Sequence, residues 1–308
     1  MKGQRTTLGS VALRSLMWLA LAATTATSLL TASCKSIGGG NSGHHDGTLT
    51  STSSSVNKNV RYGLPASASS DPSNRDAYLI ERPEFVLSYN DTAKTPNWVC
   101  WRLVHDDIGD APRGSFTPDP LLPDGFKRVT SSVYDSSGFD RGHMCNSKDR
   151  TRTVEENDAT FFTTNIVPQA PNNNQQGWEE LESYCRRLAT QGHELYIVCG
   201  PYGVGGEGKN GHRDTIGKGD IKVRVPSHTW KVIMILPEPG AVPNKQTRTI
   251  AVWMPNDQTV TTDWKKYIVS IRFVEDRTGY RFFPKLNDTV AKAIKANPDL
   301  GESVAHEN

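Results

Sequence analysis

The chain has 308 residues, of which 36% are hydrophobic and 22% charged, with 26 glycines and 18 prolines. These proportions suffice for one globular core with many turns, and they exclude a polytopic membrane protein, a coiled coil and a mainly disordered chain. The net charge of +2 becomes −1 when the three basic residues of an N-terminal leader, Lys2, Arg5 and Arg14, are removed. Attraction to an anionic polymer must therefore come from a local cluster of charge.

Residues 1–33 are typical of an export signal, because they contain three bases, no acid and an apolar run. The strongly apolar part is shorter than the roughly 20 residues that a bilayer-spanning helix needs, which argues against a transmembrane anchor. The sequence LTASC at 30–34 resembles the lipobox of bacterial lipoproteins, with Thr31 where leucine is usual. This resemblance implies that Cys34 becomes the acylated first residue. Ordinary cleavage that leaves a secreted protein is the alternative.

Four regions follow from these patterns. A lipoprotein-type signal peptide occupies 1–33, and a flexible tether rich in Gly, Ser, Thr and Asn occupies 34–58. The folded domain is expected at 59–300, with a tail at 301–308. The expected location is the bacterial cell envelope, periplasmic or at the cell surface, with the membrane as a partner through Cys34.

Within the domain, short apolar runs between turn residues predict strands at 84–89, 98–104, 195–199, 221–225, 230–236 and 249–254. Residues 178–190 carry their apolar side chains on one helical stripe, which predicts an amphipathic helix. Runs of strands with few helices, and no regular alternation of strand and helix, favour an α+β fold. We expect a mainly antiparallel central sheet flanked by helices.

The densest chemical signal is the sequence Asp140-Arg141-Gly142-His143. It resembles the signature of the DNA/RNA non-specific endonuclease family. The blocks NIVPQ at 165–169 and NQQGW at 174–178 repeat the next part of the family pattern in order and spacing, and similar positions extend over essentially the whole domain. The resemblance implies a ββα-metal active-site motif, in which a histidine from a β-hairpin faces an asparagine from a following helical segment.

Hydrolysis of a phosphodiester needs a base for the attacking water and a positive group for the phosphoryl oxygens. An imidazole with a pKa near 6.5 suits the base, and the resemblance assigns that role to His143. It assigns Asn174 as the protein ligand of a divalent ion. A single amide oxygen binds weakly, so the ion would keep waters and take phosphate oxygens, as Mg²⁺ does, with Mn²⁺ or another divalent cation as alternatives. A helix N-cap is the structural alternative for Asn174.

Glu182 and Arg186 are assigned next by the resemblance. Glu182 would contact the water shell of the metal or help protonate the leaving oxygen, and Arg186 would bind phosphate. The alternative is a surface ion pair between these two residues, which lie four positions apart on the predicted helix.

Arg141 and Arg113 are expected to clamp phosphate, because the planar guanidinium suits bidentate contact. Asp140 is expected to fix the hairpin or to orient a neighbouring arginine, and Asn165 to support the site.

A basic cluster surrounds His143 in the sequence, made of Arg141, Lys148, Arg150 and Arg152. Such a cluster would contact the sugar-phosphate backbone, which carries no sequence information. A solvated loop is the alternative.

Two further patterns need an interpretation. The glycine motif at 203–208 is followed by a glycine-broken stretch that cannot open a helix, so we expect a mobile loop rather than a dinucleotide site. Four cysteines in an exported domain favour two disulfides, although the sequence does not determine which cysteines pair. Buried thiols are the alternative. The four are Cys100, Cys145, Cys185 and Cys199. A zinc site is disfavoured because the paired C-x-x-C spacing is absent.

Together these patterns predict an exported, Mg²⁺-dependent endonuclease that hydrolyses DNA and RNA with little sequence preference. The family resemblance implies 5′-phosphate ends. The alternative is a catalytically inactive surface lipoprotein that binds nucleic acid, although such a protein has no need of both His143 and Asn174. The sequence leaves the oligomeric state open.

Overall fold

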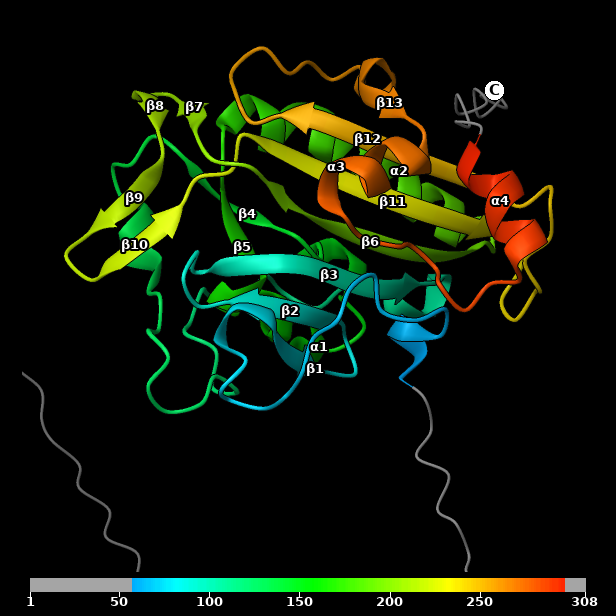
Figure 1. The fold of residues 1–308 in the computed structure, drawn as a ribbon, viewed down its shortest axis with the longest axis horizontal. Coiled ribbons are helices and arrows are strands. Elements are labelled where there is room, and N and C mark those ends of the chain that lie inside the picture. The colour runs from blue at the N-terminus through cyan, green and yellow to red at the C-terminus, as the bar shows by residue number, and fades with distance from the viewer. Residues whose placement is uncertain (1–56, 297–308) are drawn as a thin grey trace, which may run out of the picture. The chain divides into compact units, whose positions relative to one another are not determined.

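The computed structural model of the protein describes residues 57–296 (Figure 1). The predicted leader, the predicted acylation site at Cys34, the predicted tail and nearly all of the predicted tether lie outside the described residues. Between residues 57 and 296, no helix combines the length and the hydropathy that a membrane crossing requires.

The central element is a seven-stranded sheet in which every pair of neighbouring strands is antiparallel. Five of the six predicted strands belong to it. In spatial order its strands are β1 (Tyr78–Glu81), β2 (Val86–Asn90), β3 (Thr95–Leu103), β6 (Glu194–Tyr202), β11 (His228–Leu236), β12 (Arg248–Pro255) and β13 (Ile268–Val269). The predicted α+β class with a mainly antiparallel central sheet is confirmed.

Each face of this sheet carries an apolar core, because side chains alternate between the two sides of a strand. Along β11, Val232 faces one core and Ile233 the other. Helix α2 (Glu179–Thr190) covers the face of Ile233, whereas α3 (Ile271–Thr278) and α4 (Asp288–Ala296) cover the opposite face (Figure 1). Burial on both faces explains why the long strands are almost continuously apolar.

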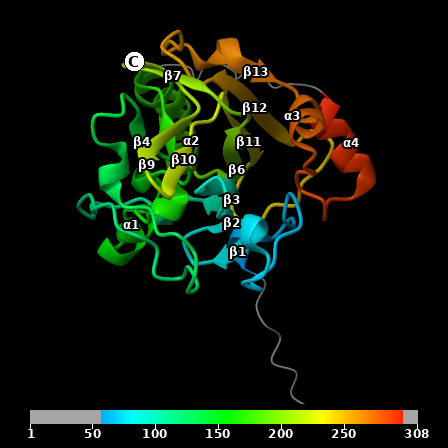
Figure 2. The same cartoon turned by 60° about the vertical axis from the view of Figure 1, so that its left-hand side comes forward.

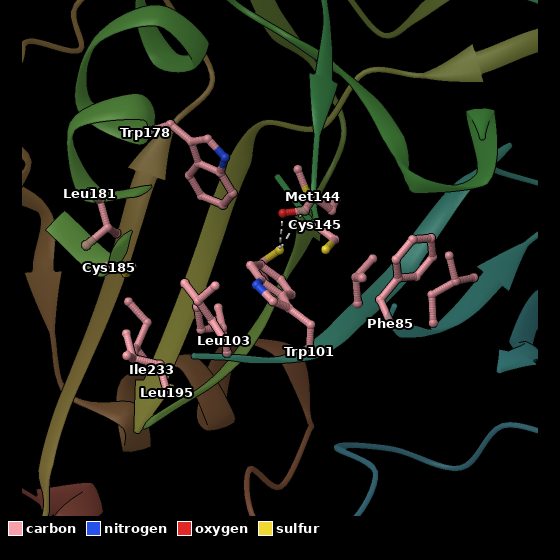
Figure 3. Close-up of a cluster of buried hydrophobic side chains, with 14 of the residues drawn as sticks. Phe85, Trp101, Leu103, Met144, Cys145, Trp178, Leu181, Cys185, Leu195 and Ile233 are labelled. Carbon is pink, nitrogen blue, oxygen red and sulfur yellow. Dashed lines mark hydrogen bonds between the residues drawn. The ribbon is translucent and has the colours of Figure 1, made fainter. Parts of the chain in front are cut away.

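The core under α2 joins the helix to the strand that carries the DRGH motif. Trp178 and Leu181 from the helical side, and Met144 and Cys145 from the segment after the motif, pack near Trp101 (Figure 3). Helix α2 begins one residue later than predicted, and a π-helical turn at Asn173–Trp178 precedes it. The motif and the helix are thus anchored to the same core.

Three two-stranded antiparallel ladders lie beside the central sheet. A third apolar cluster, which includes Phe139, Ile166 and Ile216, packs two of them together (Figure 2). The remaining helix is α1 (Val154–Thr160). The ladders pair β4 (Asp140–His143) with β5 (Ile166–Gln169), β7 (Gly206–Gly208) with β8 (Gly211–Arg213), and β9 (Thr215–Lys218) with β10 (Ile221–Arg224).

The prediction of a mobile loop at 203–208 is wrong for its second half, because β7 pairs with β8 in a hairpin. Close packing requires glycine there. A Cβ on Gly208 would lie 2.5 Å from the carbonyl oxygen of Gly138, just before the motif strand. The segment that follows enters a strand, which agrees with the rejection of a dinucleotide site.

The favoured prediction of two disulfides is also wrong. All four cysteines of the described part are buried and free. Cys100 lies in the core of one sheet face while the other three lie in the core of the opposite face. Burial raises the pKa of these thiols, to about 12 for Cys185, so they behave as small apolar side chains.

Candidate active site

His143 ends strand β4 with its side chain buried, 9% exposed. Its imidazole packs against Phe116 and Phe161, with ring centroids 5.2 and 4.7 Å away. Burial, with the nearby positive charge of Arg113, lowers the pKa of His143 to about 3. The imidazole is therefore neutral at physiological pH, and its Nε2 atom has no hydrogen-bond partner within the described structure.

Arg113 shares the aromatic pair with His143. Its guanidinium carbon lies 4.8 Å from the ring centroid of Phe161 and 5.9 Å from that of Phe116. A guanidinium held over aromatic faces keeps its charge and its donors. Arg113 therefore places a fixed positive charge beside the imidazole.

The π-helical turn places three consecutive asparagines in different surroundings. Asn173 is buried, and its amide nitrogen donates to Pro255 O (2.8 Å) and Thr229 Oγ1 (3.1 Å). Asn172 donates to Gln258 O at 2.6 Å. Asn174 alone of the three lines a cavity together with His143. Turns of this kind often occur at functional sites, because the extra residue re-aims a side chain.

Asp140 orients Asn174. Its Oδ2 accepts hydrogen bonds from Nδ2 of Asn174 at 3.0 Å and from Nε2 of Gln175 at 2.6 Å. A carboxylate only accepts, so the amide NH₂ of Asn174 faces Asp140 and the amide oxygen faces away. Of the two roles expected for Asp140, the orientation of a neighbouring arginine is not observed: Arg141 donates to Ser131 O at 3.0 Å and pairs with Asp135.

Glu182 projects from α2 and is only 4% exposed. It accepts hydrogen bonds from the amide of Asn146 and from Lys231 Nζ, the latter at 3.1 Å. Burial raises the pKa of Glu182, against the lowering effect of Lys231 and Arg186. The carboxyl group thus lies in a buried network whose cation comes from the central strand β11.

Arg186 bonds to Asp149 rather than to Glu182. Its guanidinium donates to Asp149 Oδ1 at 3.1 Å and to Ser183 Oγ at 2.9 Å. It is not among the residues that line the cavity of His143. The alternative surface ion pair with Glu182 is not formed either, because Glu182 pairs with Lys231.

Asn165 is fully buried, and its side chain links the segment that follows His143 to the end of helix α1. Its side chain accepts from the backbone nitrogen of Cys145 and donates to the carbonyl oxygens of Cys145 and Thr160, all at 2.8–2.9 Å. These hydrogen bonds fix the backbone that follows His143, so Asn165 supports the site without lining its cavity.

Five of the eight predicted site residues line one cavity of about 170 Å³, namely Arg113, Arg141, His143, Asn174 and Glu182. Sequence reasoning assigned no role to Asn146 and Gln175, which also line the cavity, or to Lys231, which pairs with Glu182. Their contacts in the structure identify them. The lining consists of Arg113, Arg141, His143, Asn146, Ser147, Lys148, Asn174, Gln175, Glu179 and Glu182.

The predicted basic cluster is only partly present at the cavity. Arg150 is 2% exposed, and its guanidinium donates to Glu84 O and Arg102 O, both at 2.7 Å. Arg152 pairs with Glu156. Arg141 and Lys148 are the members that line the cavity, so the prediction for Arg150 is wrong and that residue stabilises the backbone instead.

The donor set fits a hard divalent cation. An amide oxygen from Asn174 and a buried carboxylate from Glu182 border the cavity, and oxygen ligands are what Mg²⁺ prefers. Within residues 57–296, no three His, Cys, Asp or Glu side chains form a metal-binding group. A cation bound here would therefore be coordinated largely by oxygens of water and of a bound substrate.

Replacing Lys231 by methionine should reduce the free energy of unfolding by about 3–5 kcal/mol, because it leaves the buried Glu182 carboxylate without its cation. Urea unfolding of the purified protein measures this. Lys148→Met is the matched control: its exposed pair with Glu179, at 3.1 Å, should contribute about 0–1 kcal/mol. Equal effects of the two substitutions would contradict this assignment.

Comparison with known proteins agrees with this geometry. Residues 64–289 match the family described as DNA/RNA non-specific endonuclease. A nuclease from Nostoc sp. is 42% identical over 255 residues, which cover 82% of this chain and 89% of that protein. The mitochondrial nuclease EXOG of Mus musculus is 32% identical over 208 residues, covering 66% of this chain but only 56% of that longer protein.

A solved structure titled as the EndoG/EndoGI complex matches with a TM-score of 0.63 and 26% identity, over 77% of this chain and 95% of that one. The ladder β4–β5 and helix α2 correspond to the ββα-metal motif that the resemblance implied. The chain therefore belongs to the DNA/RNA non-specific endonuclease family, and it is a hydrolase that acts on nucleic acids.

Proposed function

We propose that this protein is an Mg²⁺-dependent endonuclease that hydrolyses phosphodiester bonds of DNA and RNA. The observation that carries the proposal is the shared cavity of His143 and Asn174. One side chain offers a neutral, unpartnered imidazole nitrogen, and the other an amide oxygen turned away from Asp140. Membership of the family supports the reaction class.

His143 takes the proton from the attacking water. Its lowered pKa keeps the imidazole unprotonated at neutral pH and so available as an acceptor. A bound phosphate is negatively charged, so it opposes the effect of Arg113 and raises the basicity of His143 when substrate is present. The base is thereby strengthened in the complex.

Asn174 would hold the divalent ion directly and Glu182 would hold it through water. The ion supplies neutralisation of charge on the phosphoryl and leaving oxygens. Arg113 and Arg141 bind the phosphate from the cavity wall, and Asp140 acts through Asn174 by fixing its amide. We assign Arg186 to positioning of Asp149 rather than to direct phosphate contact, because it does not line the cavity.

Weak sequence preference follows from the same lining. Its arginines suit phosphate oxygens, which are identical along the polymer, whereas base identity is read at base edges. A second candidate, a binding protein without turnover, is distinguished by cleavage itself.

Digestion of a plasmid and of RNA should require Mg²⁺ and stop in EDTA. His143→Ala should lower the rate by about 10²–10⁴-fold through loss of the general base. Asn174→Ala should raise the Mg²⁺ concentration needed for half-maximal rate. Initial rates across a Mg²⁺ titration measure both effects.

Asn172→Ala is the matched control, because it removes a neighbouring amide that bonds to Gln258 outside the cavity; its rate should stay near that of the parent. Strong cleavage in EDTA would exclude the metal mechanism. Binding of nucleic acid without any cleavage would favour the second candidate.

The pH profile tests the state of His143. Protonation removes the base, so kcat/KM falls as pH decreases through the pKa; because that pKa is lowered, the acid limb should lie well below pH 6.5. Arg113→Met removes a positive charge, which should raise the pKa and move the limb to higher pH. A small chromogenic phosphodiester provides the rates.

Arg152→Met, an equal loss of charge at a surface pair with Glu156, should leave the limb in place. A limb near the ordinary histidine value that does not move with Arg113→Met would contradict this assignment. The shift of the limb with Arg113→Met, rather than its position alone, assigns it to His143.

We also propose export and anchoring of the protein in the bacterial cell envelope through an acylated Cys34. The leader composition and the sequence LTASC support this, because several acyl chains on one residue give stable membrane binding. Cells expressing the protein should incorporate radiolabelled palmitate into it, and Cys34→Ala should abolish the label. Label that persists in Cys34→Ala would disprove anchoring at this residue.

A further inference from the structure

A second cavity, of about 520 Å³, lies between the β9–β10 hairpin and residues 132–137. Strand β10 of the hairpin contacts β5, the partner of β4, and the hairpin shares the third apolar cluster with the ladder of β4 and β5 (Figure 2). The cavity is larger than the active-site cavity, and no role assigned above uses it. The lining residues that matter here are Val133, Asp135, Arg213, Ile216, Lys218 and Ile221.

One ion pair links the linings of the two cavities. Arg141 lines the active-site cavity, and Asp135, which pairs with Arg141, lines the second one. A polynucleotide bound at His143 that extends past Arg141 toward Asp135 would reach the second cavity.

The charge of the second cavity is positive. Residues 209–224 contain five basic and two acidic residues. The acid in the lining, Asp135, is compensated by Arg141. Within residues 57–296, Arg213 and Lys218 belong to none of the ion pairs, and the guanidinium of Arg213 donates only to the neighbouring carbonyl of His212, at 3.1 Å. Both cations are thus available to a phosphate.

The same cavity has an apolar wall. Ile216 is buried, and Val133 and Ile221 pack against it in the third cluster. Apolar side chains beside a few convergent polar groups are typical of small-molecule sites, and the volume lies within the usual range of about 300–1,000 Å³. A nucleotide matches both features, because its base packs on apolar surface while its phosphate pairs with cations.

We propose that this cavity binds a nucleotide of the substrate strand that flanks the cleaved bond, with its phosphate at Arg213 and Lys218 and its base against Val133 and Ile216. The proposal rests on the proposed nuclease function and adds a subsite to it. Contacts to phosphate and to the face of a base distinguish poorly between bases. The subsite therefore adds affinity for the strand without adding sequence preference.

The test measures binding of a fluorescein-labelled oligothymidylate of about eight nucleotides to the full chain by anisotropy in EDTA. Arg213→Ala combined with Lys218→Ala should weaken binding by roughly five- to tenfold. Loss of two phosphate contacts to a single strand should also reduce the slope of log K against log salt by about 1.4.

Lys209→Ala combined with Lys222→Ala is the matched control, since it removes the same charge from the same segment outside the cavity lining. It should leave affinity within about twofold and the salt slope nearly unchanged. Equal weakening of oligothymidylate binding by both double variants, or no weakening by either, would contradict the proposed subsite. Unchanged thermal unfolding confirms that each variant is folded.

Failure of the proposed function has a separate signature. It would appear as no cleavage of plasmid or RNA by the parent chain with Mg²⁺, whereas the binding measurement in EDTA does not depend on cleavage.

Discussion

The hydrogen bond from Asn174 Nδ2 to Asp140 Oδ2, 3.0 Å long, joins the two halves of the candidate site. Asp140 begins the strand that His143 ends, and Asn174 lies in the turn that leads into α2. The bond fixes which amide atom of Asn174 faces the cavity and ties the turn to the motif strand. Without it, the imidazole and the amide oxygen would have no fixed geometry relative to each other.

A buried charge network beneath the cavity supports this arrangement. Lys231 Nζ lies 3.1 Å from Glu182 and 4.1 Å from the ring centroid of Trp178. Trp101 Nε1 donates to Asp149 at 3.0 Å, and Arg186 pairs with the same carboxylate. Buried charges that lose a partner destabilise the fold strongly, so this network couples the structure of α2 and the sheet to the chemistry above them.

Much of the fold was predictable from local pattern. The long strands bury both faces and are therefore apolar runs, and α2 carries a clear stripe, so residues such as Leu181 and Ile233 identify them. Strand β7 was missed because its glycines obscure any periodicity, and the hairpin of β4 was implied by the family resemblance rather than by its own residue pattern. Helices α1 and α3 are only 7 and 8 residues long, too short to present a distinct stripe.

The role of a site residue could be predicted where its residue type and motif determine that role. It could not be predicted where the role depends on contacts with distant parts of the chain. His143 and Asn174 lie together, as the motif spacing implied. Arg150 belongs to the same stretch of sequence, but it is turned inward to backbone carbonyls. Composition cannot separate a buried arginine from an exposed one, nor a buried thiol from a disulfide, because long-range packing decides both.

The central claim is that His143 and Asn174 act on one scissile bond. A double-mutant cycle on kcat/KM, with His143→Ala, Asn174→Ala and the double variant, tests it most directly. If both side chains serve one reaction centre, the effects should be strongly non-additive, and the double variant should be about as slow as the slower single variant. Rate losses that multiply independently would contradict a shared reaction centre.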